Sequence, residues 1–427
     1  MRPIGAKSCK DVMKVVEEVF LLLDSTQVLR PGIAGWHQYL GSGKIGNIAT
    51  SQVLQIYDKY KREPSNVIEC VETLRRNVSS FHMGKQTFRG WSYASSGPPV
   101  PCVEPTFWAI SALSTVNRSE ADLVNEANLF FVGTRRVSEE GSSWGFTPFT
   151  EPRVTATCIA IHALYKIGNY EVAREGIRWI LSARGNHKGW GASRNSPPTL
   201  SHTAIVLMML ADTGETCQHP DLSNAVEFLN ENILPYLCSR GKIFELGESA
   251  GFQEIIEVPS YPGLVERPSR ISYYYNPLAL TASAIAKSNA RSPVVYGCAM
   301  KIIDLWYNKR WKHRYLTESS HCTSWSIYNN LEAIWPVYVE FRKKPLNLIF
   351  YYCGKTNITV LSLPFLGWVA SKKTQKVFRF CGRVIIHSFI IGLMIYLFKS
   401  DIKLNDSILS VILSVIANYI YSALTHK

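Results

Sequence analysis

Three side chains that are capable of acid–base chemistry stand at matching places in a repeated sequence pattern. Each precedes, by one or two residues, a threonine that opens an apolar run, and the pairs are Glu104–Thr106, His202–Thr203 and His321–Thr323. If the repeats are equivalent in space, these side chains meet at one end of the fold, where a carboxyl group and imidazoles can donate and accept protons. We therefore predict Glu104, His202 and His321 as catalytic residues.

Each of these residues also has a structural interpretation. A carboxylate at a helix start stabilises the unpaired N–H groups of the first turn, which accounts for Glu104 without any chemistry. A lone histidine at a helix start is more often a hydrogen-bonded structural residue. A third alternative is a metal site that adds Cys322 to the three residues. The ten cysteines are scattered singly, however, without a CxxC pair, so we predict neither a metal nor another cofactor.

The threonines belong to a pattern that repeats along most of the chain. A tryptophan is followed 12 to 15 residues later by the threonine, and the pairs are Trp36–Thr50, Trp91–Thr106, Trp144–Thr157, Trp190–Thr203 and Trp311–Thr323. Thr281 opens a sixth apolar run without a tryptophan before it. Because the tryptophans of the first four pairs fall in turns, we predict that they hold neighbouring repeats together. Repeats of this length are typical of stacked helix pairs.

The apolar runs are predicted to be inner helices. Segments 103–113, 154–164 and 200–210 are apolar on most sides, and each has a threonine placed to cap its first turn. The segments between them, such as 221–237, are apolar on one face only and are predicted to be outer helices. Six such pairs bury their inner members by closing into a ring of two layers, an (α/α)6 toroid, or by stacking as an open solenoid. We expect the ring.

The repeat resembles those of squalene–hopene cyclases, plant class II diterpene cyclases and the β subunits of protein prenyltransferases. The similarity covers about residues 30 to 340 and is clearest in RGWSYASSGPPVPCVEPTFWAISAL (89–113) and KGWGASRNSPPTLSHTAIVLMML (188–210). It implies an all-α toroid with a central cavity at the start of the inner helices. Aromatic walls of such cavities stabilise carbocations in the cyclases. The candidates for the cavity lining here are Phe107, Trp108, Tyr273, Tyr274, Tyr275 and Trp325.

The catalytic motifs that the resemblance implies are incomplete in this chain. The cyclases carry an Asp-x-Asp-Asp run just before the repeat threonine, where this chain has Thr199-Leu200-Ser201-His202. The prenyltransferases bind zinc through an Asp, a Cys and a His. His202-Thr203 resembles their His-Thr position, but the Asp-x-Cys partner is missing, and Glu104-Pro105-Thr106 stands in a comparable place without a thiolate.

The C-terminal part differs from the repeats in charge and in hydropathy. From residue 342 onward the chain has twelve Lys and Arg residues against two acidic ones, whereas the first 341 residues have 34 basic and 31 acidic ones. The apolar runs 384–398 and 408–424 are roughly 15 to 17 residues long, at the short end of what spans a bilayer. Basic residues precede the first run, as on the cytoplasmic side of membrane proteins. The sequence predicts a two-helix transmembrane hairpin; a pair of buried core helices is the alternative.

These features divide the chain into four parts. We predict an N-terminal helix in 1–30, the repeat domain in 31–341, a basic interfacial linker in 342–383 and the transmembrane hairpin in 384–427. Within the linker, 346–370 is expected to lie at the membrane surface or to re-enter it. The hairpin places the protein in the cell membrane with a cytoplasmic repeat domain. We expect the basic tail to contact anionic lipid head groups and not nucleic acid.

Two classes of function remain open. In the first, the toroid binds an isoprenoid, another apolar ligand or a protein partner without the usual catalysis of these families; a divergent isoprenoid-processing enzyme that uses Glu104 is its variant. In the second, a non-enzymatic membrane effector or sensor, of the kind found in bacterial antiviral defence or toxin systems, acts through 384–427. The proline-containing insertion 239–270 is too long for an ordinary connection. It is a lid, a loop that binds a protein partner, or a solvated insertion.

Overall fold

The computed structural model describes only part of the chain, and that part forms one compact unit. The described residues are 2–93, 100–116, 121–215, 222–238, 249–258, 269–307, 311, 322–343, 347–353 and 358–364. All of them lie in the unit formed by residues 1–367, which is separate from the unit formed by 368–427. Within the described residues, no helix is both long and apolar enough to cross a bilayer. The predicted spans at 384–398 and 408–424 lie outside these residues.

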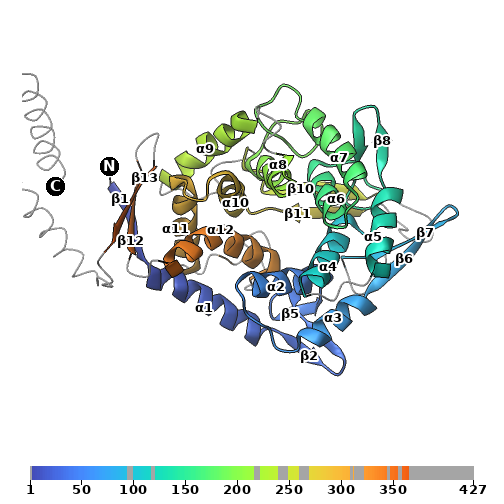
Figure 1. Ribbon diagram of the computed structural model, residues 1–427, viewed down its shortest axis with the longest axis horizontal. Helices are drawn as coiled ribbons and strands as arrows, with labels where there is room; N and C mark the ends of the chain where they lie inside the picture. Colours follow the sequence, from blue (N-terminus) through green and yellow to red (C-terminus); the bar gives the residue numbers. More distant parts are fainter. Residues whose placement is uncertain are drawn as a thin grey trace, which may run out of the picture. The chain divides into compact units, whose positions relative to one another are not determined.

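Six inner helices form a closed ring in unit 1–367 (Figure 1). They are α2 (Asn47–Lys59), α4 (Val103–Thr115), α6 (Val154–Lys166), α8 (Leu200–Asp212), α10 (Pro277–Asn289) and α12 (Ser324–Lys343). Each contacts the next along the chain, and α12 contacts α2. Most of their residues are buried because these helices are apolar on most sides. The all-α prediction is confirmed, and the contact between α12 and α2 closes the ring instead of leaving an open solenoid.

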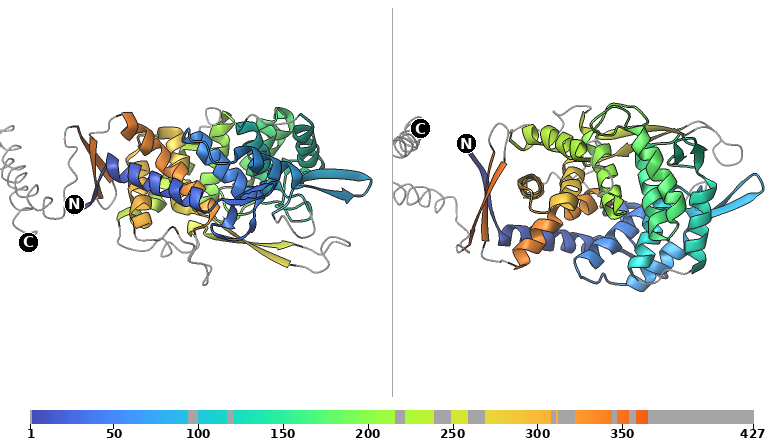
Figure 2. Two further views of the ribbon diagram at one scale, coloured as in Figure 1. Left: turned by 90° about the horizontal axis from the view of Figure 1, so that it is seen from below. Right: turned by 45° about the horizontal axis from the view of Figure 1, so that its top comes forward.

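Six outer helices surround this ring (Figures 1 and 2). They are α1 (Cys9–Ser25), α3 (Val67–Arg76), α5 (Ala121–Gly133), α7 (Tyr170–Ala183), α9 (Leu222–Cys238) and α11 (Pro293–Tyr307). Each of α3, α5, α7, α9 and α11 contacts the inner helix that precedes it, whereas α12 is covered by α1 and α11. Helix α1 therefore packs against α12, the last helix of the described residues.

Side chains at the junction of the first and last repeats hold the ring closed. The Ser324 hydroxyl donates a hydrogen bond to Gln52 Oε1 at 3.1 Å, and the Tyr60 hydroxyl donates to the carbonyl of Leu331 at 2.9 Å. Such contacts between residues some 270 positions apart can form only after the intervening repeats have curved round. The closure is thus a property of all six helix pairs together.

Four tryptophans fix the inner helices α2, α4, α6 and α8, each to the outer helix before it. The backbone N–H of Trp144 donates to Thr157 Oγ1 at 3.0 Å, and its ring Nε1–H donates to the carbonyl of Phe131 in α5 at 2.7 Å. The same two bonds recur for three other tryptophans with their Thr and carbonyl partners, namely Trp36 (Thr50, Leu23), Trp91 (Thr106, Leu74) and Trp190 (Thr203, Ile180). We call this pair of bonds the Trp–Thr staple.

The staple corrects the predicted role of the threonine. In the four stapled repeats the threonine is the fourth residue of its inner helix, and its hydroxyl accepts from the tryptophan N–H, so it does not cap the first turn. Thr323 directly precedes α12, and its hydroxyl does cap that helix by accepting from the Ser326 N–H at 3.2 Å. The prediction that the tryptophans join neighbouring repeats is confirmed, since all four of the stapled rings are at most 1% exposed. Buried indole N–H groups need an acceptor, which the end of the outer helix supplies.

Five short antiparallel hairpins connect the helices of the described part. They are β2–β3 (Val28–Arg30, Ile33–Gly35), β4–β5 (His37–Tyr39, Ser42–Ile45), β6–β7 (Val78–Met83, Gln86–Trp91), β8–β9 (Arg136–Ser138, Gly141–Ser143) and β10–β11 (Gln253–Val258, Ser269–Tyr274). The β10–β11 hairpin belongs largely to the insertion 239–270 and precedes α10, the inner helix whose repeat has no tryptophan.

The two ends of unit 1–367 come together in a small sheet. Strand β1 (Arg2–Ser8) pairs antiparallel with β12 (Asn347–Cys353), which pairs with β13 (Ile358–Pro364). The predicted N-terminal helix in 1–30 is therefore preceded by a strand. Much of the segment 346–370, which we expected at the membrane surface, forms these two C-terminal strands.

Candidate ligand-binding cavity

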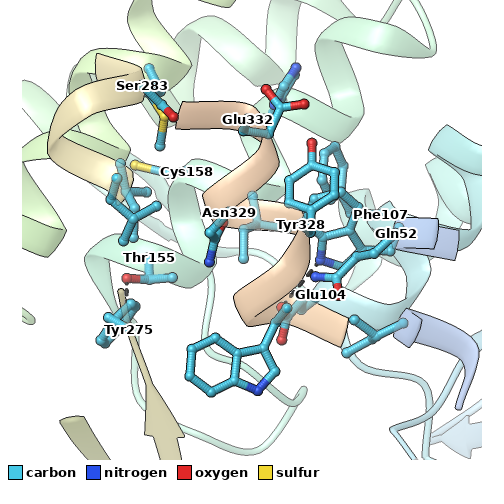
Figure 3. Close-up of a pocket in the computed structure, with 18 of the residues that line it drawn as sticks. Gln52, Glu104, Phe107, Thr155, Cys158, Tyr275, Ser283, Tyr328, Asn329 and Glu332 are labelled. Carbon is cyan, nitrogen blue, oxygen red and sulfur yellow. Dashed lines mark hydrogen bonds between the residues drawn. The ribbon is translucent and has the colours of Figure 1, made fainter. Parts of the chain in front are cut away.

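The ring of inner helices encloses a cavity of about 830 Å³. Every inner helix contributes to its wall, and so do β11 and the segment before α4. Figure 3 shows Glu104 and Tyr275 towards one end of the cavity and Ser283 and Glu332 towards the other. The first end is formed by the N-terminal ends of the inner helices, and the other is where α2, α6 and α8 end, at Lys59, Lys166 and Asp212.

Aromatic residues make up about a third of the cavity wall. The six aromatic residues named from the sequence all lie around it, namely Phe107, Trp108, Tyr273, Tyr274, Tyr275 and Trp325. The rings pack against one another: the centroids of Trp108 and Tyr328 are 4.8 Å apart in an edge-to-face arrangement, and those of Phe107 and Trp108 are 5.0 Å apart. Such a wall offers an apolar surface and negative ring faces to a ligand.

Glu104 lies at the N-terminal end of the cavity and is only 6% exposed. Its carboxylate accepts hydrogen bonds from the Tyr93 hydroxyl at 3.0 Å, the Trp108 ring N–H at 3.2 Å and the Tyr273 hydroxyl at 2.7 Å. Burial raises the pKa of Glu104, while the three hydrogen bonds act in the opposite direction. The residue at the N-cap position of α4 is Cys102, so the side chain of Glu104 ties cavity-wall residues together instead of capping the helix.

His202 does not line the cavity, but it is buried in a second polar network that reaches the cavity wall. Its Nδ1 lies 2.7 Å from Thr199 Oγ1, and its Nε2 lies 3.3 Å from Glu254 Oε2. The same carboxylate oxygen accepts a hydrogen bond from the Tyr275 hydroxyl at 2.6 Å, and that hydroxyl also lies 2.9 Å from Thr155 Oγ1 (Figure 3). The network attaches the β10–β11 hairpin to α6 and α8, which explains why His202 is only 2% exposed.

Of the three predicted catalytic residues, the structure describes Glu104 and His202, which lie in separate polar networks. Glu104 and His202 belong to the two networks just described, which touch through the rings of Tyr273 and Tyr275, 4.9 Å apart. His321 lies outside the described residues. Within the described part, no group of three His, Cys, Asp or Glu side chains could hold a metal ion.

Charged residues gather at the C-terminal end of the cavity. We call Lys59, Lys166, Asp212, Lys287 and Glu332 the charged cluster; all five line the cavity. Lys59 forms an ion pair with Glu332, and Lys287 forms one with Asp212. The Lys287 side chain is 42% exposed and the Asp212 side chain 27% exposed, so this end of the cavity is in contact with water.

Lys166 is placed differently from the other two lysines. Its Nζ donates to Ser111 Oγ at 3.2 Å and lies 5.5 Å from the ring centroid of Phe107. Nearby, burial and the ammonium of Lys166 lower the pKa of His162 to about 4, although Asp212 lies 3.9 Å away. His162 is therefore neutral at neutral pH and adds no positive charge to the cluster.

The charged cluster was not predicted, yet the sequence contains a signal for it. The second residue after the repeat threonine lines the cavity in every inner helix, and these residues are Gln52, Trp108, Ile159, Ile205, Ser283 and Trp325. Seven residues further on is about two helical turns, which is the same face. Four of the six residues there are charged, namely Lys59, Lys166, Asp212 and Glu332. Glu254 was missed because it belongs to the insertion and has no counterpart in other repeats.

Comparison with known proteins finds likeness in structure only. No protein-family model and no curated protein sequence matches this chain. Among solved structures, it is similar to the type II terpene cyclase MstE from Scytonema at 13% identity and a TM-score of 0.48, covering 79% of this chain and 99% of that one. It is also similar to Candida albicans protein geranylgeranyltransferase-I in complex with GGPP, at 10% identity and a TM-score of 0.38, covering 78% of this chain and 86% of that one. At such identities and TM-scores these are similarities in fold, and they carry no conclusion about what this chain does.

Proposed function

We propose that this protein binds one elongated apolar ligand, an isoprenoid or a chain of similar size, inside the ring of inner helices, and that it does so without proton-transfer catalysis. The observation that carries this proposal is the cavity of about 830 Å³ with its aromatic wall. Cavities of roughly 300–1,000 Å³ with mainly apolar linings are typical of small-molecule sites.

The hydrogen bonds of Glu104 support binding over catalysis. A carboxylic acid that protonates an alkene must carry its proton and direct it at the substrate. Both carboxylate oxygens of Glu104 instead accept hydrogen bonds, from Tyr93, Trp108 and Tyr273. This arrangement stabilises the ionised form and occupies the oxygens.

Binding can be tested by filling the cavity. Ile205 lines the cavity wall, so Ile205→Trp should reduce the affinity of the full chain for geranylgeraniol, a neutral isoprenoid alcohol, at least about tenfold, equivalent to about 1.4 kcal/mol. Affinity is measured by native mass spectrometry and by titration of tryptophan fluorescence. The matched control is Ile68→Trp on the outer helix α3, where the side chain is 59% exposed and outside the cavity.

The expected result is a loss of binding in Ile205→Trp and unchanged binding in Ile68→Trp. Equal binding by both variants would place the ligand elsewhere and contradict the proposal. If the wild-type chain binds neither geranylgeraniol nor a straight-chain alcohol, the ring is not a chain-binding site, and the non-enzymatic effector becomes the better account.

A second candidate is a divergent isoprenoid-processing enzyme that uses Glu104. The observation in its favour is the buried carboxyl group in an aromatic cavity, whose pKa burial raises. Product analysis after incubation with squalene and with geranylgeranyl diphosphate separates the two accounts. Turnover in the wild-type chain that Glu104→Gln abolishes would establish the enzyme and overturn the non-catalytic proposal.

We further propose that residues 384–427 anchor the protein in a membrane. Two apolar runs and the basic residues that precede them support this. The test is flotation of the full chain and of a chain lacking 384–427 with vesicles that contain anionic lipids. The full chain should float and remain attached in high salt, whereas the truncated chain should stay in the soluble fraction. Release of the full chain by salt alone would contradict a transmembrane anchor.

A further inference from the structure

The charges of the five residues in the charged cluster do not cancel, because three are lysines and two are carboxylates. Two of its three lysines have a carboxylate partner, in the pairs Lys59–Glu332 and Lys287–Asp212. Lys166 has only a neutral hydrogen-bond partner among the described residues, the Ser111 hydroxyl. With His162 neutral, the charged groups that line this end of the cavity leave one positive charge uncompensated.

We infer that Lys166 binds the carboxylate head group of a long-chain acid whose tail fills the aromatic part of the cavity. The inference rests on the proposed function and adds the chemical class of the ligand and its direction in the ring. The Nζ atom of Lys166 faces the ring of Phe107, where the aromatic wall begins. A head group bound at Lys166 therefore places the first carbons of its chain on an apolar surface.

The size of the charge excess selects the kind of head group. One uncompensated lysine matches a head group with a single negative charge, such as a carboxylate. A diphosphate carries more charge and would lie beside Asp212 and Glu332, whose carboxylates repel it. The cluster thus favours a monoanion over the diphosphate of an activated isoprenoid.

The surroundings of Lys166 also favour a bound anion. Burial lowers the pKa of Lys166, since the protein replaces part of the water around its ammonium group. A carboxylate at hydrogen-bond distance would restore that lost solvation and would form a charge-assisted bond. A neutral head group such as an alcohol cannot do this equally well.

The experiment compares acids with matched alcohols on the full chain. The probes are geranylgeranoic acid against geranylgeraniol and palmitic acid against hexadecanol, which separate an isoprenoid chain from a fatty-acyl one. In the wild-type chain the preferred acid should bind about tenfold more tightly than its alcohol. Lys166→Met should bring that ratio close to one while retaining alcohol binding, and Lys166→Arg should keep most of the preference.

The control is Lys61→Met, because Lys61 is 75% exposed, pairs with Asp58 and does not line the cavity. Its ratio of acid to alcohol affinity should equal that of the wild-type chain. Equal affinities for acid and alcohol in the wild-type chain would overturn the inference while leaving chain binding intact. Tighter binding of geranylgeranyl diphosphate than of geranylgeranoic acid would overturn it as well. If no acid and no alcohol binds, the proposed function itself has failed. Should Lys166→Met not fold, the wild-type ratios and Lys166→Arg still decide.

Discussion

The repeats of α8 and α10 start with the same threonine position but hold it in different ways. In α8, Thr203 Oγ1 accepts from the Trp190 N–H at 3.0 Å and is also within hydrogen-bond distance of the Trp190 carbonyl, at 3.2 Å. In α10, Thr281 is fully buried, and its hydroxyl has no hydrogen-bond partner among the described residues. A buried hydroxyl without a partner costs free energy.

The difference coincides with the part of the chain that supplies residues to the cavity wall. Before α10 the chain forms β11 instead of a tryptophan turn, and Asn276 caps the helix by accepting from the Ala279 N–H. That strand brings Tyr273 and Tyr275 to the N-terminal end of the cavity, where their hydroxyls donate to Glu104 and Glu254. Among the described residues, the α10 repeat therefore has no Trp–Thr staple, and the segment before its helix forms part of the cavity wall.

Removal of a stapling tryptophan is expected to have the largest effect on stability. Trp144→Ala should lower the free energy of unfolding by about 3–5 kcal/mol, because the ring is fully buried and its loss leaves a cavity and an unpaired Phe131 carbonyl. Chemical denaturation of the full chain measures the change. The control is Trp325→Ala. Because Trp325 lines the cavity, its removal should lower the free energy of unfolding much less. Equal losses would mean that the staple does not hold the repeats.

Substitution of the glycine before a stapling tryptophan should cause the second-largest loss of stability. A Cβ atom at position 189 would lie 2.4 Å from Thr203 Oγ1 and 3.0 Å from its methyl carbon, so Gly189→Ala must push the staple apart. We expect a loss of about 1–3 kcal/mol by the same denaturation assay. Gly46→Ala is the comparison, because its Cβ would meet atoms no closer than 3.5 Å. A smaller loss at 189 than at 46 would refute the close-approach explanation.

Much of this architecture could be predicted from the sequence, because the staple joins residues 13 to 15 positions apart in each stapled repeat. Trp190 and Thr203 are close in sequence and mark a repeat that can be counted, so the inner helices and the ring follow from local patterns. The partners of the candidate site could not be predicted in this way. Tyr273 hydrogen-bonds to Glu104 although the two are 169 residues apart in the sequence, and Glu254 contacts His202 across 52 residues. Both partners come from the region around β10–β11, which departs from the repeat and therefore has no pattern to follow.

Removing the hydroxyl of a stapled threonine tests the hydrogen bond by itself. Thr203→Val keeps the shape of the side chain but leaves the Trp190 N–H without its acceptor inside the protein. The expected loss is about 1–2 kcal/mol, the cost of an unsatisfied buried donor. The measured quantity is the midpoint of urea unfolding, with the m-value unchanged from that of the wild-type chain. No change in midpoint would show that the threonine hydroxyl is not the acceptor on which the staple depends.

The same substitution in the α10 repeat, which has no tryptophan, should change stability least, and the change can have the opposite sign. Thr281→Val removes a buried hydroxyl that has no partner among the described residues and replaces it with a methyl group of the same shape. We therefore expect a change within about 0.5 kcal/mol of zero, or a gain of up to about 1 kcal/mol. The decisive quantity is the difference between the two Thr→Val variants measured side by side. If Thr281→Val lowered the free energy of unfolding as much as Thr203→Val, the α10 threonine would be held as firmly as the stapled ones. The contrast drawn between the α8 and α10 repeats would then be wrong.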